Sequence, residues 1–353
     1  KRVNSVYGTA TLSYANKIFL DVTGRNDWSS TLPSGNNSFF YPSVSTSFIL
    51  SDLFRLPEQI SFAKLRASWA QVGNDTAPYK TAKYYNTSAF PGSASVSSTL
   101  YNARFKPEIS NSIEVGLDWR MFKQRFGLDL AFYNNITRNQ ILDVPMDQTT
   151  GYTKATMNSG KVRNRGIELQ LDGTPVKTKN FTWNSTFTWA KNYNKVLSLA
   201  AGLTDGQTIA YTGGTNCALI AKVGGSIGDI YGKAFVRDGS GNIVYEAGGE
   251  NKGLPQVEGD GNTVKVGNAN PLFSMGWSHT LSYKGVSLYF LIDCRYGGDI
   301  LSQTQADMDM YGVSKTTADA RDDGYIMLEG HRVENVKGFY KNVVGGRAGV
   351  TEY

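Results

Sequence analysis

The sequence has few of the residues that stabilise disulfide-rich or metal-binding domains. Its two cysteines, Cys217 and Cys294, lie far apart and match no metal-binding spacing, so we expect neither a disulfide nor a cysteine-based metal site. No apolar run approaches the roughly 18 residues of a transmembrane helix. No basic stripe predicts a nucleic-acid partner, and no signal peptide opens the chain, which we expect to be a piece of a longer polypeptide.

Long segments instead alternate between apolar and polar residues. From Ile113 to Met121 the odd-numbered residues are apolar, whereas Glu114, Asp118 and Arg120 have the other parity. A strand points successive side chains to opposite faces, so this segment has one apolar and one charged face. We predict about ten such strands, at Ser5–Ser13, Ile18–Gly24, Phe40–Leu50, Ile60–Val72, Ser112–Phe122, Arg125–Thr137, Thr156–Asp172, Phe181–Asn192, Leu272–Tyr283 and Val286–Arg295.

The connections between these strands are alternately short and long. Turns such as Lys123-Gln124 and Lys284-Gly285 contrast with the long segments Gly73–Glu108 and Tyr193–Asn270, and we predict irregular structure after Tyr296. Outer-membrane barrels have this asymmetry, with short periplasmic turns and long extracellular loops, whereas soluble sandwiches mix the two. We also predict two aromatic girdles, with Trp119, Trp183 and Trp277 toward the short turns and Trp69 and Trp189 toward the long loops.

The predicted fold is therefore all-β, a transmembrane antiparallel β-barrel. The polar faces are too charged to fill a small barrel, so we interpret the ten strands as an arc of a larger one. A soluble β-rich binding protein is the alternative. The residues that we expect to face the lumen are Arg66, Glu114, Asp118, Arg120, Asp129, Glu168, Asp172, Asp293 and Arg295.

Several segments, in this order and spacing, resemble the SusC/RagA-type TonB-dependent transporters. They are Phe40–Asp52, Leu65–Asn74, Glu114–Asp118, Asn158–Glu168, Phe181–Trp183, Asn192–Val196, Ile230–Gly232 and Gly267–Pro271. The resemblance implies a 22-stranded outer-membrane barrel of a Bacteroidetes-type bacterium. It further implies a plug domain, a contact with the TonB complex through an N-terminal region missing here, and a capping SusD-like lipoprotein.

On this interpretation the chain, residues 1–353, is a partial barrel domain without the plug and the terminal strands. Residues 193–270 are a long extracellular loop insert. The implied function is TonB-dependent import of an oligosaccharide or a peptide, without enzyme activity, and the alternative is an outer-membrane barrel enzyme or adhesin. Loop aromatics that could contact a glycan or peptide are Tyr84, Tyr85, Tyr101, Tyr152 and Tyr211.

Three motifs with possible chemistry receive structural interpretations. Gly224–Gly228 matches a nucleophile elbow but lies in a glycine-rich loop, so we interpret it as a turn. Asp238, Ser240, Asn242 and Glu246 alternate like a calcium loop, but Ile243 replaces the required glycine; we expect no cofactor, with loop-bound calcium as the alternative. His279 is interpreted as an interfacial side chain.

Paired carboxylates on two strands also resemble a glycosidase arrangement. Glu114 with Asp118, and Glu168 with Asp172, are spaced four residues apart, which places each pair about 13 Å apart along its strand. Glycosidase carboxylates must flank a single bond at closer, set separations. We therefore expect the lumen carboxylates to pair with Arg66, with Arg120 or with plug residues, and we predict no catalytic or metal-binding residue.

Overall fold

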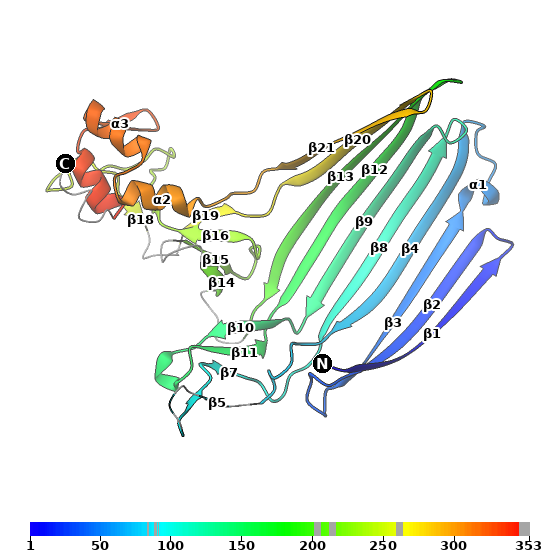
Figure 1. Cartoon of the computed structure of the whole chain (residues 1–353), viewed down its shortest axis with the longest axis horizontal. Helices are drawn as coiled ribbons and strands as arrows, with labels where there is room; N and C mark the ends of the chain where they lie inside the picture. Colours follow the sequence, from blue (N-terminus) through cyan, green and yellow to red (C-terminus); the bar gives the residue numbers. More distant parts are fainter. Residues whose placement is uncertain are drawn as a thin grey trace. The chain divides into compact units, whose positions relative to one another are not determined.

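The computed structural model describes residues 1–82, 85–87, 90, 92–200, 206–211, 217–258 and 264–345 (Figure 1). The chain divides into two compact units. The first, here the wall unit, comprises Lys1–Thr208, Ala221–Ile227 and Asn270–Gly298. The second, the loop unit, comprises Ile209–Ile220, Gly228–Ala269 and Asp299–Tyr353.

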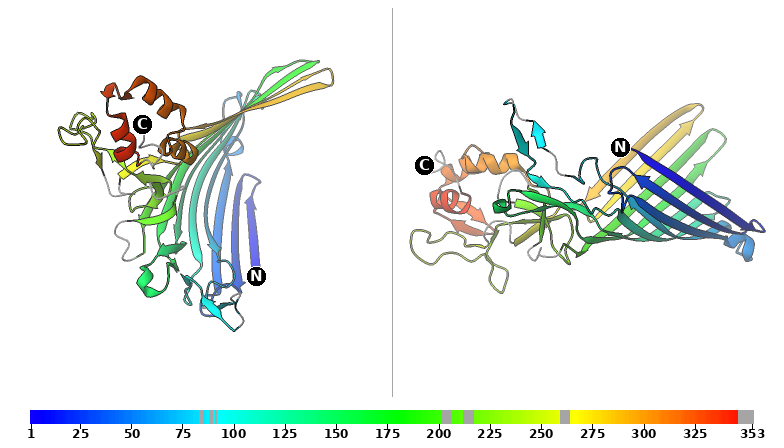
Figure 2. Two further views of the ribbon diagram at one scale, coloured as in Figure 1. Left: turned by 60° about the vertical axis from the view of Figure 1, so that its left-hand side comes forward. Right: turned by 90° about the horizontal axis from the view of Figure 1, so that it is seen from below.

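The wall unit is built on a ten-stranded antiparallel sheet whose strands follow one another in chain order, which confirms the predicted sheet. Figure 2 shows that this sheet is curved, with β1 and β21 at its two edges. The strands are β1 (Val3–Tyr14), β2 (Ile18–Ser29), β3 (Ser38–Ile49), β4 (Ile60–Asn74), β8 (Glu108–Met121), β9 (Phe126–Arg138), β12 (Lys161–Lys177), β13 (Phe181–Ser198), β20 (Phe273–Tyr283) and β21 (Val286–Tyr296).

Short and long connections lie at opposite ends of the strands, as predicted, with one exception: the β3–β4 connection at the short-turn end, residues 50–59, is longer than the β2–β3 connection at the other end, residues 30–37. At the short-turn end, β1–β2 turns through Ala15 and Asn16 and β20–β21 through Lys284 and Gly285, all with positive φ. Paired positive φ values are typical of two-residue hairpin turns whose twist matches the flanking strands. The connection from β3 to β4 holds the one-turn helix α1 (Leu50–Leu53).

The register places apolar side chains in a continuous row on one face of the sheet. This row consists of Tyr14, Ile18, Phe48, Leu65, Leu117, Leu130, Leu169, Trp189, Met275 and Cys294. The same face leaves large side chains exposed, including Ile113 at 54%, Phe132 at 48% and Leu288 at 59%. Because no described segment of the chain covers so wide an apolar face, we assign it to membrane lipid.

The aromatic girdles are not as simple as predicted. Trp119 and Trp183 lie near the short-turn ends of β8 and β13. Trp189 is at the middle of β13, and Trp277 is nearer to the long-loop end of β20 than to Tyr283, so its predicted position was wrong. The ends of neighbouring strands are staggered, so the distance from a strand's own end does not give the height in the sheet.

The connections at the long-loop end contain more structure than predicted. Between β4 and β8 lie β5 (Tyr85–Thr87), β6 (Ala94–Val96) and β7 (Thr99–Leu100), and between β9 and β12 lie β10 (Ile141–Pro145), η1 (Gln148–Thr150) and β11 (Lys154–Asn158). The single strand predicted over Thr156–Asp172 was wrong at its start. Gly160 has a φ of 92°, which ends β11 before β12 begins.

The loop unit holds the remaining elements. They are β14 (Gln207–Tyr211), β15 (Cys217–Ala221), β16 (Asp229–Gly232), β17 (Ala234–Phe235), β18 (Val257–Glu258), β19 (Val264–Asn268), α2 (Gln303–Met310), α3 (Lys315–Asp323), β22 (Ile326–Leu328), β23 (His331–Val333), α4 (Val336–Gly338) and η2 (Phe339–Val343). The first two residues of β14 and the last of β15 belong to the wall unit.

The prediction of irregular structure after Tyr296 was therefore wrong. The side chains of Ser302 and Ser314 accept hydrogen bonds from the amides of Gln305 and Thr317, which caps α2 and α3. The unit has its own apolar core, formed by Leu254, Ala320, Val333, Phe339 and Tyr340. Among the described residues, no helix is long and apolar enough to span a membrane.

Candidate lumen-facing site

An ion pair joins β4 to β9 on the charged face of the sheet. The Arg66 guanidinium donates two hydrogen bonds to the Asp129 carboxylate, at 2.9 and 2.8 Å, and lies 3.7 Å from Glu114. Gly116 is directly opposite Arg66 on β8, and a Cβ there would lie 2.4 Å from Arg66 Nε. The arginine therefore crosses the intervening strand through the space left by the missing side chain.

Arg120 repeats this arrangement one strand further along. Its guanidinium donates to Asp118 at 2.8 Å and to Asp172 on β12 at 3.2 Å. On the way it passes over Gly127 of β9, where a Cβ would lie 2.3 Å from Arg120 Nη1. Each of these arginines thus extends over a glycine of the neighbouring strand and binds a carboxylate on the strand beyond it. We call Arg66 and Arg120 the bridging arginines.

A tyrosine makes a third crossing of the same kind. The Tyr133 hydroxyl of β9 passes over Gly166 of β12 and donates to the Asn192 side chain of β13 at 3.2 Å. Asn192 and Asn194 then donate to Asn164 at 3.1 and 2.9 Å. Polar links therefore connect four neighbouring strands, β4 to β12, and continue onto β13.

A cavity of about 340 Å³ opens on this face beside Arg66. Its lining includes Glu114, Asp129, Glu168 and Asp293, with Arg66 as its cation. Glu168 and Asp293 form no ion pair with any described residue. The register of the sheet thus places all nine predicted lumen residues on one face. Arg295, the last of them, lies in the same cross-strand row as Glu168. That these nine residues act as a site stays a prediction.

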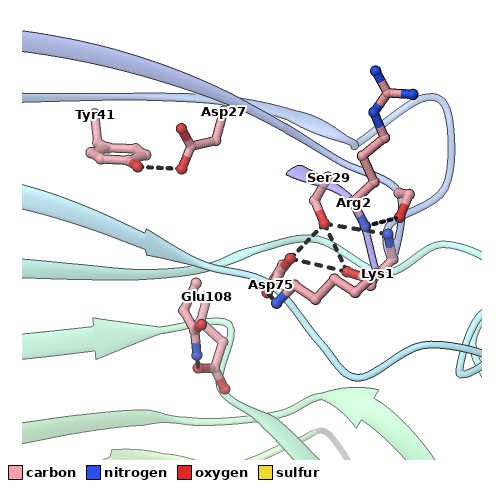
Figure 3. Close-up of polar contacts among 10 residues, drawn as sticks. Lys1, Arg2, Asp27, Ser29, Tyr41, Asp75 and Glu108 are labelled. Atoms are coloured by element: carbon pink, nitrogen blue, oxygen red, sulfur yellow. Dashed lines mark hydrogen bonds and ion pairs between the residues drawn. The ribbon is translucent and has the colours of Figure 1, made fainter. Parts of the chain in front are cut away.

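A polar cluster ties the first strands together at the long-loop end. Asp75, just beyond β4, accepts hydrogen bonds from Lys1, Ser29 and Thr31, and Figure 3 shows Lys1 and Ser29 converging on it. Burial raises the pKa of Asp75, but the bonds from these three residues outweigh burial and leave the pKa below its ordinary value. Nearby, Tyr41 donates to Asp27, so the rim of the wall is held by side-chain contacts.

Among the predicted loop aromatics, the structure describes the side chains of Tyr85, Tyr101 and Tyr152. Tyr85 is exposed on β5, while Tyr101 and Tyr152 are half-buried. Tyr84 lies outside the described residues, and for Tyr211 only the backbone is described, as part of β14. Their contact with a ligand stays a prediction.

The other motifs form local structure. Ser226, in the turn Gly224–Gly228, donates to Asn194 at 3.3 Å and accepts from Asn270 at 2.8 Å. Asp238 accepts the amides of Ser240 and Asn242, which lowers its pKa. Among the described residues no group of three His, Cys, Asp or Glu side chains could hold a metal ion, and loop-bound calcium stays untested.

His279 lies on the outer face among aromatic rings. Trp183 Nε1 donates to His279 Nδ1 at 3.1 Å, and the rings of Trp277 and Phe290 lie 4.6 and 4.8 Å from the imidazole. Cys217 and Cys294 are not joined by a disulfide bond.

Sequence analysis missed the glycines Gly116, Gly127 and Gly166. The signal that could have revealed them was glycine at a polar-parity position within an alternating strand.

Comparison with known proteins gives one family. The profile described as "TonB dependent receptor-like, beta-barrel" matches residues 1–315. TonB-dependent receptor P26 of Formosa agariphila is 30% identical over 323 residues, which is 85% of this chain and 32% of the relative. TonB-dependent receptor SusC of Bacteroides thetaiotaomicron is 24% identical over 56% of this chain and 21% of its own length.

A solved structure has the same fold over most of the chain. The "RagAB peptide transporter" structure aligns with a TM-score of 0.72 and 21% identity, covering 87% of this chain and 35% of that chain. TonB-dependent receptor P3 of Formosa agariphila is 26% identical over 89% of this chain and 34% of its own length. The chain thus spans about a third of the length of these longer relatives.

Proposed function

Because the chain belongs to the TonB-dependent receptor-like β-barrel family, an outer-membrane family, we propose that it forms part of the wall of a transporter. The complete protein would import an oligosaccharide or a peptide with energy delivered through TonB. A SusD-like surface lipoprotein would cap the long-loop end. The chemistry is binding and gating, with no covalent step.

One observation carries this proposal: the ten strands have one apolar face and one charged face. The outer row from Tyr14 to Cys294 is apolar across every strand, while the inner face holds Arg66, Arg120 and their carboxylates. A wall of this kind separates hydrocarbon from a wet or filled interior. The cavity beside Arg66 offers a polar surface along that interior.

The alternative, an outer-membrane barrel enzyme or adhesin, has less support. An enzyme needs a nucleophile or an acid/base pair held at reacting distance. The best sequence candidate, Ser226, is instead hydrogen-bonded to Asn194 and Asn270.

Uptake by cells tests the proposal directly. We would delete the gene for the complete protein and follow uptake of labelled oligosaccharides and labelled peptides, with and without a functional TonB complex. We expect one ligand class to be lost on deletion, restored by the wild-type gene, dependent on TonB and recovered intact inside the cell. Unchanged uptake of both classes, or a ligand cleaved at the surface, would overturn the transporter assignment.

Two threonines of β13 allow a matched test of the cavity. Thr188 lines the cavity, whereas Thr182 lies on the same face near the short-turn end. If the ligand passes the cavity, Thr188→Arg should reduce uptake by roughly tenfold or more, a barrier of at least about 1.4 kcal/mol, and Thr182→Arg should leave uptake near wild type. Equal effects of the two substitutions would show that the cavity is not on the route.

The partner is tested separately by affinity purification from membranes. We expect a surface lipoprotein to co-purify with the complete protein in mild detergent and to be lost when the lipoprotein gene is removed. Full uptake without any co-purifying lipoprotein would refute the capping partner while leaving the transport proposal standing.

A further inference from the structure

Basic side chains gather on the outer, lipid-facing side of the sheet at its long-loop end. Arg163 and Arg165 of β12 have the same parity as Leu169, and Lys191 and Lys195 of β13 have the same parity as Trp189. Arg163 is directly opposite Lys195, and Arg165 is directly opposite Tyr193. Lys161 and Arg138, which face each other across β12 and β9, extend this basic patch.

The patch has no counter-charge of its own. None of its cations forms an ion pair with a carboxylate in the described part of the chain, and Arg163 Nε is buried without a hydrogen-bond partner. Like charges directly opposite each other across a strand pair repel. On the inner face, by contrast, both bridging arginines are paired with aspartates. An anion from outside the chain would remove the repulsion between Arg163 and Lys195.

The position of the patch along β13 matches one side of a bilayer. Trp183 and Tyr193 are ten residues apart, and at about 3.3 Å per residue and a tilt of about 40° they are separated by roughly 25 Å in height. That is about the height of the apolar band of an outer-membrane barrel. Trp183 therefore marks the inner-leaflet interface and Tyr193 the outer-leaflet interface.

Tyr193 also organises the cations around it. The Lys191 ammonium lies 5.0 Å and the Arg165 guanidinium 5.8 Å from the centre of its ring. Long cationic side chains reach from the apolar band toward the head groups in this way. Below them, Ile167 and Leu169 continue the apolar face, so the surface changes from hydrocarbon-compatible to cationic within a few residues.

We infer that this basic patch binds the phosphate-bearing head group of an outer-leaflet glycolipid. Arginine and lysine side chains are the usual partners of phosphate oxygens, and paired cations on adjacent strands suit a head group with more than one phosphate. The acyl chains of the same lipid would lie along Ile167, Leu169 and Trp189. The lipid would thus fix the height of the β12–β13 hairpin in the membrane.

Lipid binding to the complete, detergent-purified protein tests this assignment by native mass spectrometry. The probes are bisphosphorylated lipid A, the same lipid after enzymatic removal of its phosphates, and inorganic phosphate as a competitor. Arg163→Gln with Lys195→Gln removes two charges from the patch. Lys177→Gln with Lys284→Gln removes two charges at the short-turn end, where Lys284 also lies over a tyrosine, and is the matched control.

We expect the patch variant to bind bisphosphorylated lipid A on the order of tenfold more weakly than wild type, and the control variant to bind like wild type. Dephosphorylated lipid A should bind wild type as weakly as bisphosphorylated lipid A binds the patch variant. Equal binding of the two lipids to wild type, or displacement of lipid A by millimolar inorganic phosphate, would overturn the assignment. The lipid comparison uses wild-type protein, so it decides the matter even if the patch variant does not assemble.

Discussion

Replacing Gly116 with alanine should break the Arg66–Asp129 ion pair without touching either charged residue. The new Cβ would lie 2.4 Å from Arg66 Nε and 2.5 Å from its Cζ. These atoms are at the far end of a flexible side chain, so the arginine can swing away and relieve the clash. The cost is therefore the lost ion pair and not the collision itself.

The size of the effect follows from the exposure of the pair. Both side chains are about one-third exposed, at 33% and 32%. Charge-assisted hydrogen bonds contribute about 1.5–3 kcal/mol in general, and solvent screening reduces the pair to about 1–2 kcal/mol. Replacing a strand glycine with alanine returns about 0.5–1 kcal/mol. The free energy of unfolding should therefore fall by up to about 1.5 kcal/mol relative to wild type, and by about 1–2 kcal/mol relative to a glycine-to-alanine variant that breaks no ion pair.

Gly8→Ala is the matched control, because Gly8 lies on β1 of the same sheet and has open space around its Cα. Urea unfolding of the complete protein in lipid vesicles, followed by tryptophan fluorescence, measures both variants. The second readout is a double-mutant cycle with Asp129→Asn, which should cost far less in the Gly116→Ala background than in wild type. Equal stability of the two alanine variants, or full additivity in the cycle, would refute the reasoning.

Three further predictions concern the wall and its rim. Gly166→Ala should lower the free energy of unfolding by at least about 2 kcal/mol, more than Gly116→Ala does. The alanine Cβ would lie 2.5 Å from the backbone carbonyl oxygen of Lys191, which cannot rotate away as a side chain can. The same urea titration measures this loss. The pKa of Asp75 is lowered in the folded protein, so the ionised carboxylate stabilises the rim above about pH 4, and this stabilisation is lost as the pH falls through the folded-state pKa. Hydrogen exchange of the rim amides should therefore accelerate below that pKa in wild type but not in Asp75→Asn. Identical pH profiles of the two proteins would contradict this prediction. Cys294, on the outer face, should react with a lipid-soluble maleimide and not with a charged one, whereas Asp293→Cys, in a variant lacking both native cysteines, should show the reverse; equal labelling would refute the assignment of faces.

The ten strands were predictable because their two faces have different polarity, which makes apolar and polar residues alternate along the sequence. Leu117 and Asp118 are neighbours in the sequence, yet one lies on the apolar face and the other on the charged face, so the alternation is strict enough to be recognised directly. The order of short and long connections then fixed the meander. The extent of each strand was less accessible, and Gly160, which separates β11 from β12, was included within a single predicted strand.

The contacts between strands could not be predicted because they depend on register. Arg66 and Asp129 are separated by a whole strand, and only the pairing of Arg66 with Gly116 shows that the arginine can pass between them. The helices after Tyr296 were missed for a different reason. The segment Gln303–Met310 has no distinct apolar face and no buried residue, so periodicity gives no signal, and its cap at Ser302 is the main local evidence for a helix.

The bridging arginines of the inner face and the basic patch of the outer face differ in how their charges are compensated, and this difference bears on what each of them contacts. Inside, Arg66 and Arg120 lie across glycines and are held by aspartates of the same chain, so their charges stay compensated whatever fills the lumen. Outside, Arg163 and Lys195 face each other with no carboxylate from the described part of the chain. Pairing of charges within the same chain suits a surface that faces different molecules during the proposed transport. An uncompensated patch suits a surface whose partner is permanent, and in an outer membrane that permanent partner is lipid.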